Sequence, residues 1–483
     1  MCKGSKSVED AVLFCRQFRD KFQKLHCRNI YLYGVGKKTK QLLDNITDFR
    51  FAGLLDAELE GETIYGKKVF SLSDVVETSG VIIIVARPHV TNIIYERIGN
   101  FCEDNDIEIY DLHGNRLPCE DCLETQNGYW ETDLELIKKR ALQYDVITMD
   151  IFDTLVARSV LTIADMYQII ERNREDVPTE FAVFRRRAER ECTGNYNIYC
   201  IYDKMQELTG WDRELLKKCM EHEFAMERKI LRPRKEMCDL LEWLRNNGKQ
   251  VCLASDMYWS QDRIRELLDT LDIRGYQTLF VSCDEGKSKK DGSLFEKIKS
   301  LYAGCKIMHI GDNRYDDMES AEKNGLDAAL VLSEYEMLML SDLRNLLNEA
   351  NCLMDRIVLG QIKEKLFNNP FAINQHQGRV DITKTETFLY CFLCPILLKR
   401  PPMEENSLVL RASQKFCEDL GRILDLDSVH GISPRFAKAI IQWVQEHKER
   451  MTLEQRNIYQ TIFKLNVIER WIEESAEMTS KSL

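Results

Sequence analysis

The chain has 483 residues, 44% of them hydrophobic and 30% charged, with a formal net charge of −12. At roughly 150 residues per domain, this length predicts about three domains. The composition excludes a disordered or collagen-like chain, and the acidic balance argues against a general nucleic-acid binder.

The first 115 residues alternate between strand and helix patterns. Short apolar runs rich in β-branched residues indicate buried parallel strands, and apolar residues at steps of three and four indicate helices. The predicted strands are residues 29–34, 51–56, 81–86 and 107–110, and the predicted helices are 8–25, 37–46 and 90–102. This alternation predicts a parallel sheet with helices on both faces.

A glycine-containing turn, Gly34-Val35-Gly36, follows the first predicted strand and opens a helix. Such a turn lets the backbone approach a phosphate, whose charge is attracted to the helix N-terminus. Asp56 ends the next strand, where an acid can hydrogen-bond a ribose hydroxyl. Thr39 replaces the third glycine of the dinucleotide fingerprint, so the motif is incomplete and does not identify NAD as the ligand. Two interpretations stay open: a nucleotide site at Gly34, Gly36 and Asp56, or a tight turn that binds nothing.

Residues 28–112 also resemble a known kind of domain. The matching segments are Gly34-Val-Gly36, Gly53-Leu-Leu-Asp56 and Gly61 to Val69. They are similar to the N-terminal Rossmann-like domains of sugar acetyltransferases and related sugar-modifying enzymes. The resemblance implies a Rossmann-like domain over residues 1–115 that binds a nucleotide or nucleotide-sugar.

The rest of the chain divides into a linker, a second sheet domain and a helical region. Residues 116–143 predict a polar linker followed by a helix, and residues 334–483 read as helical. Strand patterns lie between them, at 145–150, 250–255, 279–282, 306–310 and 328–332. After the first of these strands, residues 160–245 are helical and heavily charged, which indicates a helical insertion into a parallel-sheet domain over 144–333.

Chemistry-bearing side chains follow three of these strands. Asp150 ends the first strand, Ser255 ends the second, and Asp312 with Asp317 follows a third. A lysine-rich loop, residues 286–292, lies between the last two. Carboxylates at one sheet edge can hold Mg²⁺, and a lysine with a hydroxyl can balance the charge of a transferring phosphoryl group.

Residues 145–332 resemble the haloacid dehalogenase (HAD) superfamily of hydrolases. The resemblance covers Asp150-Ile-Phe-Asp-Thr-Leu155, Ser255-Asp256, a lysine, and Gly311-Asp312 with Asp317. It implies that residues 160–245 are the mobile cap of this family. The Asp-Ile-Phe-Asp-Thr motif together with Ser255-Asp-Met-Tyr258 looks like the branch encoded with bacterial surface-polysaccharide genes.

The same resemblance implies roles for single residues. Asp150 would be the nucleophile that forms an aspartyl-phosphate, and Ser255 would hydrogen-bond the phosphoryl oxygens. Lys289 fits the spacing to a following aromatic residue, with Lys287 and Lys290 left open. The implied Mg²⁺ ligands are Asp150, the main-chain carbonyl of Phe152, Asp312, and Asp317 or its neighbour Asp316.

One position departs from the family pattern. Phosphatases of the family usually carry a second Asp two residues after the nucleophile, where this chain has Phe152, and Asp153 follows one residue later. Loss of a general acid/base costs on the order of 10²–10⁴ in rate. Four interpretations compete: a phosphohydrolase in which Asp153 or a substrate group supplies the proton, a dehalogenase-like hydrolase, phosphoryl transfer to an acceptor other than water, and a catalytically weak binding domain. The intact Gly311-Asp312 with Asp317 favours Mg²⁺-dependent phosphoryl chemistry.

The sequence therefore predicts an α/β protein with a Rossmann-like domain, a capped HAD domain and a helical C-terminal region. We expect a Mg²⁺-dependent hydrolase of a phosphorylated sugar or sugar-linked metabolite in surface polysaccharide biosynthesis, with polysaccharide-assembly proteins as partners. The alternative is a nucleotide-sugar-binding scaffold. The 17 scattered cysteines indicate reduced thiols and a cytoplasmic location. The apolar stretch 387–398 is too short to span a bilayer and contains Pro395, so it predicts a buried helix.

Overall fold

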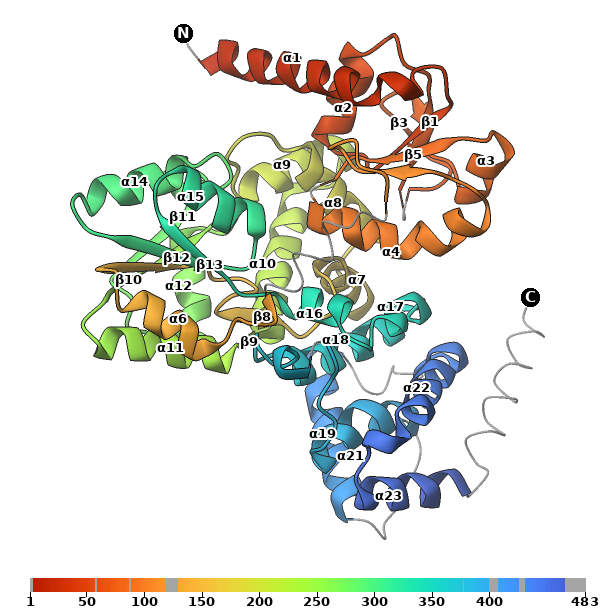
Figure 1. Cartoon of the computed structure of the whole chain (residues 1–483), viewed down its shortest axis with the longest axis vertical. Coiled ribbons are helices and arrows are strands. Elements are labelled where there is room, and N and C mark those ends of the chain that lie inside the picture. Colours follow the sequence, from red (N-terminus) through yellow and green to blue (C-terminus); the bar gives the residue numbers. More distant parts are fainter. Residues whose placement is uncertain are drawn as a thin grey trace. The chain divides into compact units, whose positions relative to one another are not determined.

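The computed structural model describes residues 3–56, 59–86, 88–117, 129–376, 378–398, 407–424 and 431–464. The chain divides into two compact units, Met1–Gly128 and Tyr129–Leu483 (Figure 1). Residues 118–128 of the predicted linker lie outside the described residues.

The first unit is built on a four-stranded parallel sheet in the order β2-β1-β5-β6. Neighbouring residues of β5 point to opposite faces: Ile83 packs with Phe18 and Leu42, and Ile82 packs with Ile98. Both faces are therefore covered by helices, and the predicted parallel α/β arrangement is confirmed. The elements are α1 (Lys3–Phe22), η1 (Gln23–Leu25), β1 (Ile30–Tyr33), α2 (Lys37–Asn45), β2 (Phe51–Leu55), β3 (Thr63–Ile64), β4 (Lys67–Lys68), α3 (Leu72–Glu77), β5 (Val81–Ile84), α4 (Pro88–Asp104) and β6 (Ile109–Tyr110).

The second unit contains a five-stranded parallel sheet in the order β11-β10-β7-β12-β13. Strand β7 is central and pairs with both β10 and β12, so the carboxyl ends of these three strands meet at one sheet edge. The strands are β7 (Val146–Met149), β10 (Gln250–Ser255), β11 (Thr278–Val281), β12 (Ile307–Gly311) and β13 (Asp327–Leu330). The helical elements among them are α6 (Leu134–Ala141), α11 (Lys235–Asn246), α12 (Gln261–Thr270), α13 (Ser282–Glu285), α14 (Ser293–Leu301), η2 (Arg314–Glu319) and α15 (Ser320–Lys323).

Four helices are inserted after β7, between the antiparallel strands β8 (Val156–Arg158) and β9 (Leu231–Pro233). They are α7 (Ile163–Asn173), α8 (Phe181–Glu191), α9 (Ile198–Thr209) and α10 (Arg213–Ile230). A fully buried pair joins two of them, since Arg185 of α8 donates two hydrogen bonds of 2.7 Å to Glu223 of α10. The expected insertion extended to residue 245. Helix α11 instead contacts β10 and α6, because its apolar side chains face the sheet domain.

The C-terminal helices share one apolar cluster with the sheet of the second unit. Helix α18 approaches the chain after β8 closely, and a Cβ on Gly360 would lie 2.6 Å from the backbone nitrogen of Leu161. Lys363 of the same helix donates to the carbonyls of Arg158 and Val160, both at 2.9 Å. Part of this region is therefore packed onto the sheet domain. The elements are α16 (Glu334–Leu340), α17 (Asn345–Glu349), α18 (Leu353–Phe367), η3 (Asn374–His376), α19 (Thr385–Phe388), η4 (Leu389–Leu393), α20 (Cys394–Leu397), α21 (Ser407–Gly421), α22 (Pro434–Glu446), η6 (Lys448–Arg450) and α23 (Leu453–Lys464).

The apolar stretch 387–398 forms a succession of short helical segments, α19, η4 and α20. Its residues Phe388 to Ile396 are buried. Among the helices that the structure describes, none has both the length and the apolar character to cross a bilayer.

Candidate active site

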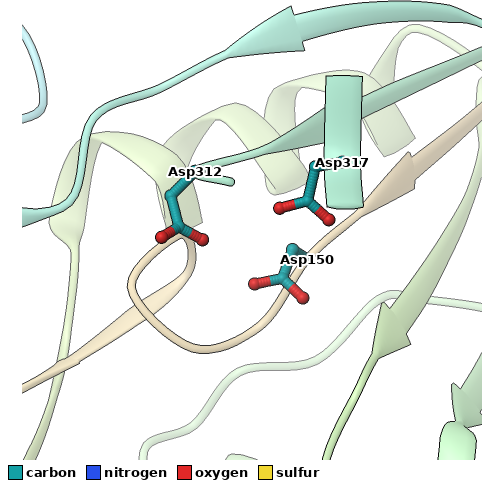
Figure 2. A group of neighbouring side chains, drawn as sticks. All are labelled: Asp150, Asp312 and Asp317. Atoms are coloured by element: carbon teal, nitrogen blue, oxygen red, sulfur yellow. The ribbon is translucent and has the colours of Figure 1, made fainter. Parts of the chain in front are cut away.

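Three carboxylates meet at the carboxyl edge of the second sheet. Asp150 follows β7, Asp312 follows β12, and Asp317 lies in the turn of η2 (Figure 2). Each offers an oxygen, and these three oxygens lie within 4.8 Å of one another. Gly311 makes this approach possible, because a Cβ there would overlap the carboxyl group of Asp317. The structure thus brings together the three carboxylates that the sequence proposed as metal ligands.

Lys289 lies among these carboxylates. Its side chain is buried, and its ammonium donates to Asp150 and, at 2.5 Å, to Oδ1 of Asp317. Asp256 holds the lysine loop in place by accepting hydrogen bonds from the backbone N–H groups of Lys289 at 2.9 Å and Lys290 at 3.3 Å. Of the three candidate lysines, Lys289 is the one whose ammonium bonds to two of the clustered carboxylates. The positioning role of Asp256 was not part of the sequence prediction.

The charges of this cluster are unbalanced. Burial raises the pKa of Asp150 to about 7, although the Lys289 ammonium opposes the shift. Burial, with the neighbouring carboxylates of Asp150 and Asp153, raises the pKa of Asp312 well above its usual range. Burial alone would lower the pKa of Lys289, but Asp150 and Asp317 outweigh it and raise that pKa. Three carboxylates thus share one ammonium. A set of hard oxygen donors with excess negative charge fits a divalent cation such as Mg²⁺.

A buried histidine that the sequence prediction missed contacts Asp317. His309 of β12 places Nε2 3.1 Å from Oδ1 of Asp317 and Nδ1 2.7 Å from Oγ1 of Thr148. Burial lowers the pKa of His309, so the ring is neutral. Since an ionised Asp317 only accepts hydrogen bonds, we infer that Nε2 carries the proton and that the Thr148 hydroxyl donates to Nδ1. The only sequence signal was one imidazole within an apolar strand.

Asp317 is held in its ionised form by its neighbours. Burial would raise the pKa of Asp317, but the Lys289 ammonium and the His309 hydrogen bond outweigh it and hold that pKa well below its usual range. The backbone N–H of Asn313 donates a further hydrogen bond of 2.9 Å to Oδ2. Asp317 is therefore oriented by three separate donors.

The loop after Asp150 turns sharply at Asp153, which has a φ of 60°. Asp tolerates this left-handed conformation better than most residues. The Asp153 N–H donates to the carbonyl of Val156 at 2.6 Å, and its carbonyl accepts from Arg234. The Phe152 carbonyl accepts no hydrogen bond within the part of the chain that the structure describes. The Asp153 carboxylate is not part of the three-carboxylate group in these described residues.

Ser255 ends β10, beside the strand that leads to Asp150. The residue is 2% exposed, and its hydroxyl makes no hydrogen bond to another described residue. It can therefore donate a hydrogen bond to an incoming group.

In the first unit, the predicted glycine turn packs closely against the neighbouring backbone and is held by a side-chain hydrogen bond. Gly34 has a φ of 106°, and a Cβ there would lie 3.2 Å from the Val85 carbonyl oxygen. The buried Thr39 hydroxyl donates to the Gly34 carbonyl at 2.5 Å, which accounts for a threonine in place of the third glycine. Gly36 caps the start of α2, and Asp56 follows β2, which pairs with β1. The three candidate nucleotide residues thus lie at the ends of paired strands.

Comparison with known proteins identifies the second sheet domain. Residues 144–325 match the family of haloacid dehalogenase-like hydrolases. No curated protein matches this chain. Among solved structures, the chain is similar to a magnesium-bound protein described as the HAD-hydrolase YfnB of Bacillus subtilis, with 13% identity over 39% of this chain and 88% of that chain and a TM-score of 0.30.

Two further structures are similar. One is a HAD phosphatase from Thermococcus onnurineus, with 16% identity over 39% of this chain and 86% of that chain and a TM-score of 0.28. The other is a dehalogenase, with 14% identity over 40% of this chain and 89% of that chain and a TM-score of 0.29. The family match contains every residue of the acidic cluster. The chain therefore carries a haloacid dehalogenase-like hydrolase domain in residues 144–325.

Proposed function

We propose that this protein is a Mg²⁺-dependent hydrolase that acts through an aspartyl-phosphate on a phosphorylated sugar or sugar-linked metabolite. The observation that carries the proposal is the convergence of Asp150, Asp312, Asp317 and Lys289 at one sheet edge of a HAD-like hydrolase domain. The Lys289 ammonium, together with a Mg²⁺ ion that the carboxylates could hold, would balance the negative charge of a phosphoryl group in transfer.

In this proposal Asp150 attacks the phosphorus atom, and its side-chain oxygen forms the new P–O bond as the bond to the leaving oxygen breaks. The leaving oxygen takes a proton from Asp153 or from a group of the substrate. Water then attacks the phosphorus of the aspartyl-phosphate, the bond to Asp150 breaks, and inorganic phosphate is released. Lys289 neutralises charge beside that oxygen, and Ser255 donates a hydrogen bond to the phosphoryl group. Mg²⁺, held by the three carboxylates and the free carbonyl of Phe152, would neutralise the transferred group. Asp256 fixes the backbone of the lysine loop.

Two other functions stay as alternatives. A dehalogenase-like reaction would explain Phe152, since a halide leaves without a proton, but the three-carboxylate group favours a cation and phosphoryl chemistry. A catalytically weak nucleotide-sugar-binding scaffold would need neither Lys289 nor the carboxylate group. Asp153 stays a candidate for the missing proton donor, since its carboxylate acts electrostatically on Asp312 although it is not part of the three-carboxylate group.

For the first unit we propose a Rossmann-like nucleotide-sugar site that uses Gly34, Gly36 and Asp56. Support comes from the open space beside Gly36 and from its position at the N-terminus of α2. A thermal-shift screen with UDP-, GDP- and CDP-sugars and NAD tests the site. No shift with any of these ligands, and no difference in an Asp56→Ala variant, would leave Gly34 and Gly36 with a structural role.

We also propose that the protein acts in the cytoplasm in surface-polysaccharide assembly, together with partner proteins, and that α7–α10 form a mobile cap. The support for these roles is the resemblance of the sequence motifs to the HAD branch encoded with surface-polysaccharide genes.

Trapping with beryllofluoride tests the catalytic proposal. Beryllofluoride mimics a phosphoryl group on an aspartate, so the wild type should form an adduct at Asp150 only when Mg²⁺ is present. The Asp150→Asn variant should form none, whereas Asp262→Asn, which changes a side chain that is 93% exposed on α12, should behave as the wild type. A wild type that forms no adduct would contradict the proposed function.

A further inference from the structure

An arginine lies on the ring that replaces the expected proton donor. The side chain of Phe152 stands two residues after Asp150, and the guanidinium carbon of Arg158 lies 4.6 Å from the centroid of its ring. We propose that Arg158 binds the leaving group, and that the site is built for phosphoanhydrides, whose leaving group is a second phosphate. This inference rests on the proposed function, because it assumes that Asp150 is a phosphoryl acceptor, and it narrows the phosphorylated substrate of that proposal from phosphate esters to phosphoanhydrides.

Arg158 is fixed from several sides. It belongs to β8, and its carbonyl accepts a hydrogen bond of 2.9 Å from Lys363 of α18. Its Nε donates to Oε1 of Glu227 at 2.7 Å, and the side chain of Glu227 is fully buried at the end of α10. Together with the Phe152 ring, these contacts hold the guanidinium in one orientation.

The outer end of the guanidinium is nevertheless available. The two terminal nitrogens of Arg158 make no hydrogen bond to any residue that the structure describes, and the side chain remains 15% exposed. Burial would lower the pKa of Arg158, but Glu227 and Asp153 outweigh it and raise that pKa, so the group is charged. A planar pair of N–H donors matches two oxygens of a phosphate.

The position of Arg158 links it to the reacting atoms through a short stretch of chain. Phe152 pairs with Val156 by a β-bridge, which brings the start of β8 back beside the nucleophile loop. Arg158 also attracts the Asp153 carboxylate, and Asp153 acts electrostatically on Asp312 of the acidic cluster. Arg158 thus places a cation over the Phe152 ring, whereas Lys289 places one among the carboxylates.

The chemistry explains why an arginine can serve where an acid is missing. When Asp150 attacks the terminal phosphorus of a phosphoanhydride, the bridging P–O bond breaks and its electron pair leaves with the second phosphate. That phosphate is a weak base and needs no proton, whereas the alkoxide of a sugar phosphate is a strong base and does. Water then attacks the phosphorus of the aspartyl-phosphate, the bond to Asp150 breaks, and the released inorganic phosphate takes the proton of the water.

UDP and UMP provide a matched test. Removal of the terminal phosphate of UDP releases UMP, whereas cleavage of UMP must release the uridine alkoxide. A missing general acid costs on the order of 10²–10⁴ in rate for the second reaction. With Mg²⁺ present, we expect kcat/KM for UDP to exceed that for UMP by about 100-fold or more. Inorganic pyrophosphate should be cleaved as well.

Variants of Arg158 test the residue itself. The Arg158→Gln variant should lose about 10- to 100-fold in kcat/KM for UDP, as expected for a charge-assisted hydrogen bond. It should keep its rate with acetyl phosphate, which releases a carboxylate and not a phosphate, and it should still form the beryllofluoride adduct at Asp150. Arg187→Gln, on the exposed face of α8, is the control and should leave all three measurements unchanged.

The outcomes separate this inference from the proposed function. Arg158→Gln leaves the buried Glu227 carboxylate without its cation, which could disturb the fold by itself. The double variant Arg158→Gln/Glu227→Gln removes that unpaired charge and is therefore measured as well. The inference alone would be overturned by a wild type that forms the adduct but has equal kcat/KM for UMP and UDP. It would also be overturned by a wild type that forms the adduct but cleaves neither UDP nor pyrophosphate. The inference would also be overturned if Arg158→Gln and the double variant both lost activity with UDP and with acetyl phosphate by the same factor. No adduct in the wild type would overturn the proposed function.

Discussion

Replacing Lys289 by Met removes the only ammonium that bonds to the clustered carboxylates of Asp150 and Asp317 in the described chain. The side chain is buried, so its loss leaves the largely buried carboxylates of Asp150 and Asp317 without their cation and with little solvent to screen them. Removing one partner of a buried ion pair costs about 3–5 kcal/mol. We therefore expect the free energy of unfolding of the second unit to fall by about this amount in EDTA.

The loss should depend on pH and on Mg²⁺. The pKa of Asp150 is raised to about 7 in the folded protein, above the value of a free carboxyl group. Between these two values the folded state binds more protons than the unfolded state, so stability falls as pH rises. Without Lys289 the pKa of Asp150 rises further and this fall continues above pH 7. The difference in the free energy of unfolding between the variant and the wild type should therefore increase from pH 6 to pH 8. Millimolar Mg²⁺ should reduce this difference.

The assay is urea unfolding at pH 6 and pH 8, in EDTA and in Mg²⁺. Lys235→Met is the matched control, because Lys235 forms an ion pair with Asp239 at the protein surface and its side chain is 77% exposed. We expect its unfolding midpoint to equal that of the wild type. If Lys289→Met were as stable as the wild type in EDTA at pH 8, or if Mg²⁺ did not change the difference, the charge argument would be refuted.

Three further changes probe the same site. Gly311→Ala should weaken activation by Mg²⁺ at least about 10-fold, because the added Cβ displaces the Asp317 carboxyl group, and a Mg²⁺ titration of activity measures this. His309→Ala removes a donor to Asp317 and should weaken Mg²⁺ binding about 10- to 100-fold, with His309→Gln less affected in isothermal calorimetry. Arg234→Met should destabilise the fold by about 2–4 kcal/mol, because it removes the buried guanidinium that donates a hydrogen bond to the Asp153 carbonyl. Urea unfolding measures this loss of stability. Unchanged Mg²⁺ affinity in the first two variants, or unchanged stability in the third, would contradict these contacts.

Much of the architecture could be predicted because its signals are local. Runs of β-branched residues, such as residues 81–84, identify strands that are buried on both faces. The rule that parallel strands end at one sheet edge brings Asp150, Asp312 and Asp317 together without any knowledge of their contacts. Glycine at position 311 marks the point where a strand must pass close to a carboxyl group.

Other features depend on contacts between distant residues and left no local signal. The bond from His309 to Asp317 requires the register of β12 against η2, and the position of Arg158 over Phe152 requires the turn at Asp153. Helix α11 has the same charged, amphipathic pattern as the inserted helices, so only its packing against β10 and α6 assigns it to the sheet domain. The packing of α18 on β8 joins residues about 200 positions apart in the chain.

If Asp150 accepts a phosphoryl group, chemical trapping should reveal the aspartyl-phosphate at that residue. The protein is mixed with acetyl phosphate and Mg²⁺, quenched in acid and treated with borohydride, which reduces an aspartyl-phosphate to homoserine. Peptide mass spectrometry should find homoserine at position 150, and only in the samples that contain both Mg²⁺ and acetyl phosphate. Unmodified Asp150 in every sample, or homoserine at position 153 instead, would contradict the account.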